Sequence, residues 1–362
     1  AYEGLPAPIR RNADAAQEDD AVPIAAVAYR PSDVGSRRYA LPRALWRDCA
    51  AAAVVLGSLI AIGVGAREMA APLAGAHPPA ISLAPGALPE YTLRTVTRML
   101  AALVASLLFT LTYGTWAAKS PRAERVLVPV LDVLQSVPVL GYLSFTAVFF
   151  VSLSPGNELG AELAAIFAIF TSQAWNMAFS FYQALKTIPA DLDEASRSLR
   201  ATGWQRFWQL DVPFATPGLV WNTMMSMSGG WFFVVASEAI SVGSTHIVLP
   251  GVGSYVARAI EEHDLTAVGY AVAAMTVAIV LYDQLLFRPL VAWADRFRFE
   301  QTAGREAPRS WVLEALGGSR LLALAGRPVG RSLARAARAR LALPQSLPGI
   351  GARLRMPELG RA

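Results

Sequence analysis

Long apolar runs alternate with shorter polar segments over most of this chain, and the pattern predicts about six membrane-spanning helices. Each run exceeds the ~20 residues that a helix needs to cross ~30 Å of hydrocarbon. A buried helix of a soluble protein explains any single run, but six such runs in one chain argue against it. The runs cover residues 44–66, 93–117, 126–153, 159–186, 218–242 and 265–288. We therefore expect an all-α, polytopic membrane protein.

Composition supports a membrane protein. Hydrophobic residues make up 54% of the 362 residues and charged residues 16%, whereas about a quarter of a soluble domain is charged. The single cysteine, Cys49, excludes an internal disulfide. No histidine pair has metal-ligand spacing, and no glycine-rich phosphate loop occurs. We expect no metal site and no directly bound cofactor.

Two polar ends flank the predicted transmembrane domain, residues 44–298. Residues 1–43 are rich in proline, alanine and charge without a sustained period, which predicts a disordered segment. Residues 299–362 form a basic tail or linker. Within it, Ser332 to Leu343 can form a basic amphipathic helix on an anionic membrane surface. A solvated linker is the alternative.

The distribution of basic residues predicts the orientation. Net charge is +5, which in a soluble protein suggests nucleic acid. Here the basic residues flank apolar runs, so we expect membrane lipids and no nucleic acid as partners. With both termini cytoplasmic, the short inside loops carry seven lysines and arginines, and the outside segments carry Arg67 and Arg258. The segment 187–217 then faces the cytoplasm of a multi-pass protein in a bacterial-type plasma membrane.

The segment 187–217 is predicted to hold two short helices. Pro189 suits a first helical turn, and the carboxylates of Asp191, Asp193 and Glu194 complement the positive end of that helix. Gly203 accepts a positive φ and is predicted to end the first helix.

An aromatic face follows on the second short helix. Trp204, Phe207 and Trp208 share a face at i, i+3 and i+4, before Pro213 and Pro217 return the chain to the membrane. Such an element can lay its apolar face in a groove of a partner protein. Alternatively, its tryptophans anchor an interfacial loop at the lipid headgroups.

The spacing Glu194-Ala195-Ser196, Gly203, Pro213 resembles the EAA loop of binding-protein-dependent ABC importer permeases. The resemblance implies coupling helices that sit in a cleft of an ATP-binding subunit. Two departures stand out. Ser196 replaces an alanine, and Arg200 occupies the family's usual glycine position. The implied contact residues are Pro189, Asp193, Glu194, Ala195, Ser196, Leu199, Arg200, Gly203, Trp204, Phe207 and Pro213.

The same resemblance implies an ABC importer type I permease-like bundle. Residues 129–140 (PVLDVLQSVPVL) and 231–240 (WFFVVASEAI) are similar to nitrate/sulfonate/taurine-type permeases. The implied partners are an ATP-binding cassette ATPase, which carries ATP and Mg²⁺, and a periplasmic or lipid-anchored solute-binding protein. A second permease bundle is also implied, from a homo- or heterodimer or from the missing half of a tandem permease. The chain itself would not be an enzyme.

Polar residues inside the predicted spans are candidates for a translocation path. They are Gln173, Asn176, Asn222, Ser226 and Glu238. Hydrogen bonds between helices are the simpler role for each amide and hydroxyl, and Glu238 is a candidate gate near the outer mouth. Residues 241–254 resemble the loop and short helix that meet a solute-binding protein; a plain connection fits equally.

The expected function is the permease subunit of an ATP-driven importer of a small solute, such as a nitrate-, sulfonate-, taurine- or bicarbonate-like anion. The alternative is an ion-gradient-driven secondary transporter, which needs inverted repeats and midplane carboxylates. The sequence shows no clear internal repeat. An intramembrane enzyme is disfavoured because all three histidines lie outside the runs.

Overall fold

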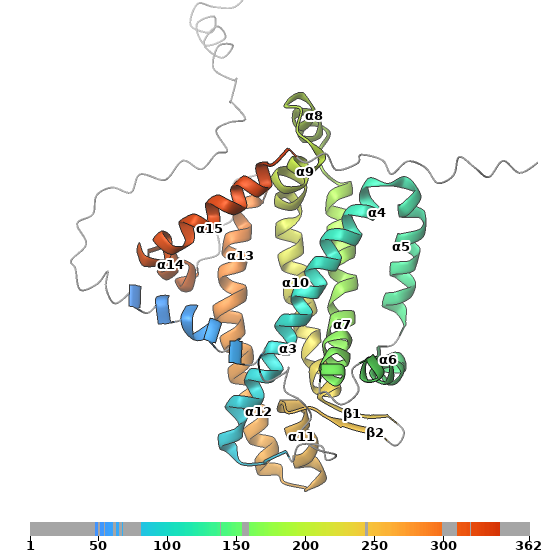
Figure 1. Ribbon diagram of the computed structural model, residues 1–362, viewed down its shortest axis with the longest axis vertical. Coiled ribbons are helices and arrows are strands. Elements are labelled where there is room, and N and C mark those ends of the chain that lie inside the picture. The colour runs from blue at the N-terminus through green and yellow to red at the C-terminus, as the bar shows by residue number, and fades with distance from the viewer. Residues whose placement is uncertain are drawn as a thin grey trace, which may run out of the picture. The chain divides into compact units, whose positions relative to one another are not determined.

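The computed structural model is helical in all its long elements (Figure 1). It describes residues 48–49, 51–53, 55–60, 63–64, 67, 81–137, 139–153, 159–242, 245–298, 310–318 and 320–340. Within these residues the strands are confined to an antiparallel hairpin of β1 (Ala239–Val242) and β2 (Thr245–Val248). The all-α prediction is confirmed, whereas the prediction for residues 1–43 lies outside the described residues.

The first half of the described chain forms a long kinked helix, a broken helix and a second long helix. Its elements are η2 (Pro85–Ala87), α3 (Leu88–Phe109), η3 (Thr110–Gly114), α4 (Thr115–Lys119), α5 (Pro121–Ser136), α6 (Val139–Leu153) and α7 (Leu159–Lys186). The α7 bounds coincide with the predicted run 159–186. Its length and apolar composition therefore located this helix from the sequence.

The second half returns through short helices to two more long ones. Its elements are α8 (Ala190–Ser198), α9 (Gly203–Arg206), η4 (Phe207–Asp211), α10 (Val212–Glu238), α11 (Val252–Glu261), α12 (Leu265–Tyr282), η5 (Asp283–Phe287), α13 (Arg288–Ala294), η6 (Asp295–Phe297), α14 (Trp311–Gly318) and α15 (Arg320–Arg338). The π-helical segments η3, η4 and η5 join their neighbours into continuous helices.

Three helices of the described chain are long and apolar enough to cross a membrane: Pro85–Lys119, Leu159–Lys186 and Leu265–Phe297. They match the predicted fourth run (159–186) and contain the second (93–117) and the sixth (265–288), so the chain is a multi-pass membrane protein. Residues 51–53 and 55–60 of the first run are helical. The total of six spans stays a prediction.

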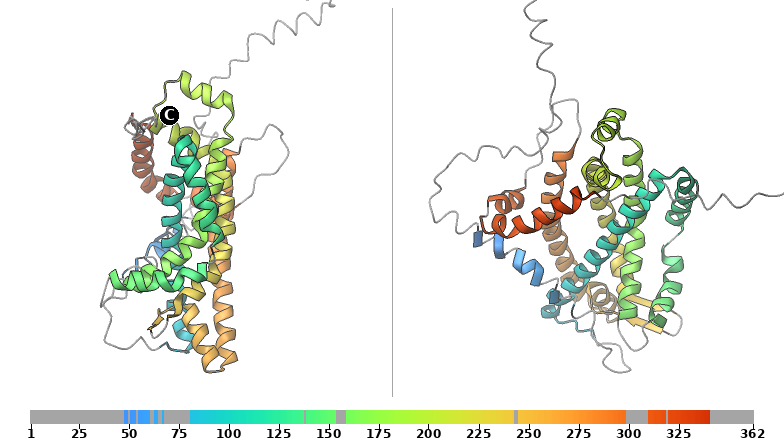
Figure 2. Two further views of the ribbon diagram at one scale, coloured as in Figure 1. Left: turned by 90° about the vertical axis from the view of Figure 1, so that its right-hand side faces the viewer. Right: turned by 45° about the horizontal axis from the view of Figure 1, so that its top comes forward.

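The predicted third run is not one helix. Val137 has an extended backbone, with φ −74° and ψ 125°, and it divides α5 from α6. The cause is Pro138, because proline disfavours the helical conformation of the residue before it. In the left view of Figure 2, α6 lies across the direction of the long helices.

The fifth run is shifted relative to its prediction of 218–242. Helix α10 begins at Val212, with Pro213 in its first turn and Pro217 inside it, and it ends at Glu238. Because η4 joins α9 to α10, Pro213 lies inside a continuous helix, and the π-helical segment η4 ends two residues before this proline, which has no amide to donate. The apolar run therefore predicted that a helix is present but misplaced both of its ends.

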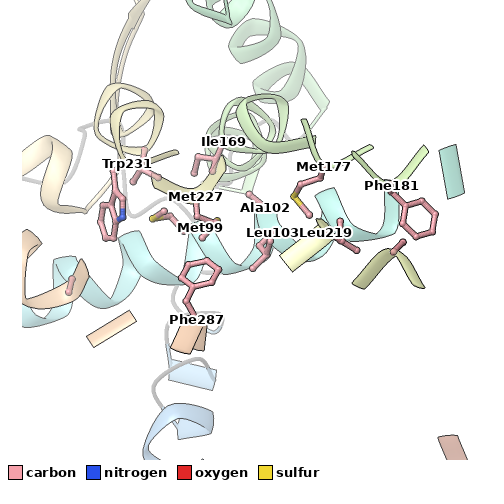
Figure 3. Close-up of a cluster of buried hydrophobic side chains, with 13 residues drawn as sticks. Met99, Ala102, Leu103, Ile169, Met177, Phe181, Leu219, Met227, Trp231 and Phe287 are labelled. Atoms are coloured by element: carbon pink, nitrogen blue, oxygen red, sulfur yellow. The ribbon is translucent and has the colours of Figure 1, made fainter. Parts of the chain in front are cut away.

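The main core lies between α3, α7 and α10 (Figure 3). Met99, Ile169, Met177 and Met227 are each at most 1% exposed, and Trp231 packs at one end. Close van der Waals packing of this kind associates helices in lipid, where tails are as apolar as the side chains.

Candidate functional site

The loop between α7 and α10 lies beyond the ends of these two helices (Figures 1 and 2). Pro189 is the N-cap of α8, one position before the first turn in which it was expected. Asp191 and Asp193 lie in that turn, as predicted, where their charges complement the helix dipole.

Helix α8 ends at Ser198, with Leu199 as its C-cap and Arg200 in the left-handed turn that follows, so the prediction that Gly203 ends it is wrong. Arg200 has a φ of 50°. Its amide donates to the Arg197 carbonyl at 2.9 Å, and the Ala201 amide donates to the Ser196 carbonyl at 3.2 Å. These two bonds form a Schellman motif, in which glycine usually occupies the left-handed position. The family's glycine position therefore keeps its left-handed backbone with an arginine side chain.

Gly203 instead begins α9. Thr202 is the N-cap, and its hydroxyl accepts from the Gln205 amide at 3.3 Å while the Gln205 side chain accepts from the Thr202 amide at 3.1 Å. This capping box satisfies donors that a helix start leaves open. The sequence analysis missed it, although threonine followed three residues later by glutamine is a readable signal.

Ion pairs connect the two short helices to each other and to the bundle. Asp193 on α8 pairs with Arg206 on α9 and, at 2.6 Å, with Arg197. Arg206 also contacts Asp211 at 3.4 Å, and the buried Asp211 carboxylate pairs with Lys119 of α4 at 2.5 Å. Asp193 is thus placed in a structural role within the loop, whereas the sequence analysis placed it among the contact residues.

Among the described residues, none packs over the outer face of α8. No residue of α8 is buried, and Leu199 at its end is 69% exposed. Glu194 is exposed and has no hydrogen bond or ion pair with any described residue. Ala195 and Ser196 are half-buried. The carboxylate of Glu194 and the apolar side chain of Leu199 are therefore both exposed on this helix and its C-cap.

The predicted aromatic face packs within itself. The ring of Trp208 lies 5.7 Å from that of Trp204 and 5.0 Å from that of Phe207. Trp204 also donates from Nε1 to the Ala336 carbonyl at the end of α15, at 2.8 Å. A contact with the tail helix was not predicted.

The candidate path residues divide into buried and accessible groups. Gln173 is fully buried and donates to the Met227 sulfur at 2.8 Å, and Ser226 is buried as well. Asn222 donates to the Ser180 hydroxyl at 2.9 Å, which joins α10 to α7. Asn176 is exposed. The hydrogen bonds of Gln173 and Asn222 each join α7 to α10, which fits the predicted role of joining helices.

Glu238 belongs to a buried polar network. Its carboxylate accepts from Arg98 NH1 at 2.7 Å, the Thr95 hydroxyl at 2.6 Å and the Gly253 amide at 2.6 Å. Arg98 in turn holds Glu162 through two bonds of 2.6 and 2.7 Å. Glu238 thus links α3 and α10 to α11, which follows the hairpin at the opposite end of the bundle from α8.

Arg98 and Glu162 were missed as functional candidates. Both lie within predicted spans, and both are at most 1% exposed. Buried charges in a membrane helix need a partner. The signal available was the presence of side chains of opposite charge, Arg98, Glu162 and Glu238, among the charged residues of the apolar runs. Sequence alone does not say which of them meet.

Comparison with known proteins identifies this architecture. Residues 110–288 match the family described as binding-protein-dependent transport system inner membrane component. Residues 110–288 therefore form a permease domain of this family of ABC importer components. The matched region includes the whole α8–α10 unit. Members of the family are transport permeases and not enzymes.

Curated relatives agree with the family. The permease is 28% identical over 191 residues to the glycine betaine/proline betaine transport system permease protein ProW of Escherichia coli (strain K12), covering 53% of this chain and 50% of that protein. It is 25% identical to the E. coli taurine transport system permease protein TauC, covering 56% and 70%. Against the bicarbonate transport system permease protein CmpB of Synechococcus elongatus it is 20% identical, covering 57% and 68%. The permease thus spans about half the length of ProW.

Proposed function

We propose that this permease is the transmembrane subunit of an ATP-driven importer of a small solute in a bacterial plasma membrane. A separate ATP-binding subunit would carry ATP and Mg²⁺. The α8–α9 unit would transmit its closure to the bundle, because a ligand shifts a conformational equilibrium only by binding two states differently. Both termini would then be cytoplasmic.

The observation that carries this proposal is the unsupported helix α8. Its nine residues include no buried one, and isolated helices shorter than ~12–15 residues are marginal in water. The Asp193–Arg206 ion pair and the Schellman motif hold it in place, but no part of the chain that the structure describes covers its outward face. A groove on a partner subunit would cover Glu194 and Leu199.

A second bundle would complete the pathway. Helix α10 exposes a stripe of Trp221, Met225 and Phe232, which are 55–61% exposed. Asn176 of α7 is also accessible. Lipid or a second bundle can cover such a stripe, and a two-fold arrangement would bring two copies of it together.

The solute-binding protein would dock at the opposite end, on the hairpin and α11. Glu238 would then lie beneath the docking surface, and its hydrogen bond with the Gly253 amide would respond to movement of α11. The relatives are named for glycine betaine, taurine and bicarbonate. Each of these solutes carries an anionic group, so a small anion or zwitterion is the proposed solute class.

Co-purification from the native host tests the proposal. We expect the tagged wild-type permease to bring an ATP-binding chain, and Glu194→Arg to lose it, because the substitution reverses the charge on the exposed face of α8. Glu261→Arg makes the same change on α11 and should retain the ATP-binding chain. A stable wild-type protein that brings none would favour the secondary transporter.

A further inference from the structure

The tail helix α15 carries a row of arginines on one side. Arg327, Arg331, Arg335 and Arg338 recur every three or four residues, which places them on one face. All four are exposed. Within the part of the chain that the structure describes, none of them is paired with a carboxylate.

The other side of α15 is apolar and uncovered. Val329 is 57% exposed and Leu333, one turn later, is 65% exposed. A helix that combines a basic face, a narrow apolar face and low overall hydrophobicity is typical of the membrane interface. A helix that packs on protein along its length buries its apolar side chains.

The neighbouring elements connect α15 to a candidate membrane span. Helix α14 precedes it and packs on α13, which continues the candidate span Leu265–Phe297. Trp311 of α14 is 58% exposed and donates to Gln284 at 3.4 Å, and Trp293 of α13 is 40% exposed. Exposed tryptophans near a span end are enriched at the headgroup level.

The far end of α15 is held by the loop. Trp204 donates to the Ala336 carbonyl at 2.8 Å, and the Gln205 side chain donates to the Arg338 carbonyl at 2.9 Å. These are carbonyls of the last helical turn, which have no partner within the helix. The C-terminal end of α15 is thereby fixed to α9 (Figure 2, right).

We propose that α15 binds anionic lipid headgroups with its arginine face and inserts Val329 and Leu333 into the lipid. This contact anchors the α9 end of the loop at the membrane surface. Four cations that pair with no described carboxylate, on the face opposite an apolar stripe, complement a negatively charged leaflet. The inference requires only that the chain is embedded in a membrane, and it stands whether or not the chain transports a solute.

Spin-label accessibility of the full-length chain in bilayers tests the proposal. The chain has one cysteine, Cys49, so Cys49→Ser gives a background for a label at Leu333→Cys or, nearer the arginine face, at Ala334→Cys. In phosphatidylcholine–phosphatidylglycerol bilayers we expect the label at position 333 to be accessible to oxygen and shielded from a water-soluble nickel reagent. The label at 334 should be less shielded, and shielding at 333 should fall in phosphatidylcholine alone.

Substitution of the arginines separates charge from folding. Each basic residue near an anionic surface contributes about fivefold to binding, so Arg327→Gln, Arg331→Gln and Arg335→Gln together should weaken the lipid-bound state roughly a hundredfold. The matched triple change to lysine should retain it. Equal exposure of position 333 to water in both lipids would overturn the proposal. The proposal would also be overturned if the label at position 333 were equally shielded in both lipids, or if its shielding required an added ATP-binding subunit.

Discussion

Arg98 and Glu162 form a bidentate ion pair inside the bundle, with Nε–Oε2 and NH2–Oε1 distances of 2.6 and 2.7 Å. The third guanidinium nitrogen binds Glu238 at 2.7 Å. The pair therefore joins α3 to α7 and, through Glu238, to α10 and α11. Because two carboxylates share one guanidinium, the whole network depends on Arg98.

Loss of Arg98 should destabilise the bundle strongly. Arg98→Met leaves Glu162 and Glu238 buried without their cation, and breaking a buried pair costs about 3–5 kcal/mol. Thermal unfolding in detergent measures the change. Arg258→Met removes an arginine that is 50% exposed and whose partners Glu261 and Glu262 are 69% and 45% exposed, and should change stability by less than about 1 kcal/mol. Equal effects of the two substitutions would contradict the role of the network.

A methyl group at Gly253 should disturb the packing of α11 against α10. The added Cβ would lie 2.5 Å from the Val235 carbonyl oxygen and 2.7 Å from the Val235 Cα. Backbone cannot yield as a flexible side chain does, so Gly253→Ala should cost about 1–3 kcal/mol. Gly269 on α12 has open space around it, and Gly269→Ala should stabilise by about 0.5–1 kcal/mol. Unfolding midpoints that do not separate the two variants would argue against close packing at Gly253.

Arg200→Gly should stabilise α8. The left-handed backbone at φ 50° costs a non-glycine residue about 1–2 kcal/mol, and glycine relieves it at a smaller entropic cost. Hydrogen exchange of the α8 amides should slow severalfold. Ser198→Gly makes the same replacement at a helical residue and should speed exchange. Slower exchange in Ser198→Gly, or faster exchange in Arg200→Gly, would contradict this reading of the turn.

Glu124 should contribute stability that depends on pH. Hydrogen bonds from Lys186 at 2.7 Å and from the Tyr182 hydroxyl at 2.6 Å lower the pKa of Glu124. The unfolded chain then binds a proton more readily than the folded one. The contribution is complete above the unfolded pKa and is lost as pH falls through the lowered folded pKa.

Unfolding midpoints measured from neutral to acid pH test this contribution. The difference between wild type and Glu124→Gln should be largest near neutrality and should vanish in acid. A constant difference for Glu124→Gln would show that its hydrogen bonds do not distinguish the two protonation states.

The sequence predicted those features that depend on local pattern. Apolar length located α7 from end to end, and the acidic first turn of α8 followed from charge placement. Pro138 carried the signal for the break at Val137, but the length of the apolar run outweighed it. The capping box at Thr202 was also readable in the sequence.

Other features depend on contacts between distant residues or on backbone choice. Arg98 meets partners 64 and 140 positions away, and no local period specifies such a pairing. Glycine is the usual signal for a left-handed turn, so the end of α8 was assigned to Gly203 when Arg200 adopts that conformation. The contact of α15 with α9 likewise joins segments more than 130 positions apart.

Photo-cross-linking from α8 tests the central claim most directly. A benzophenone amino acid at Leu199, 69% exposed on the loop, should cross-link the permease to an ATP-binding chain in native membranes. The same probe at Leu265, 84% exposed at the opposite end, should not. Absence of an ATP-binding chain from the Leu199 product, or its equal presence at Leu265, would contradict the assignment of α8 as the coupling helix.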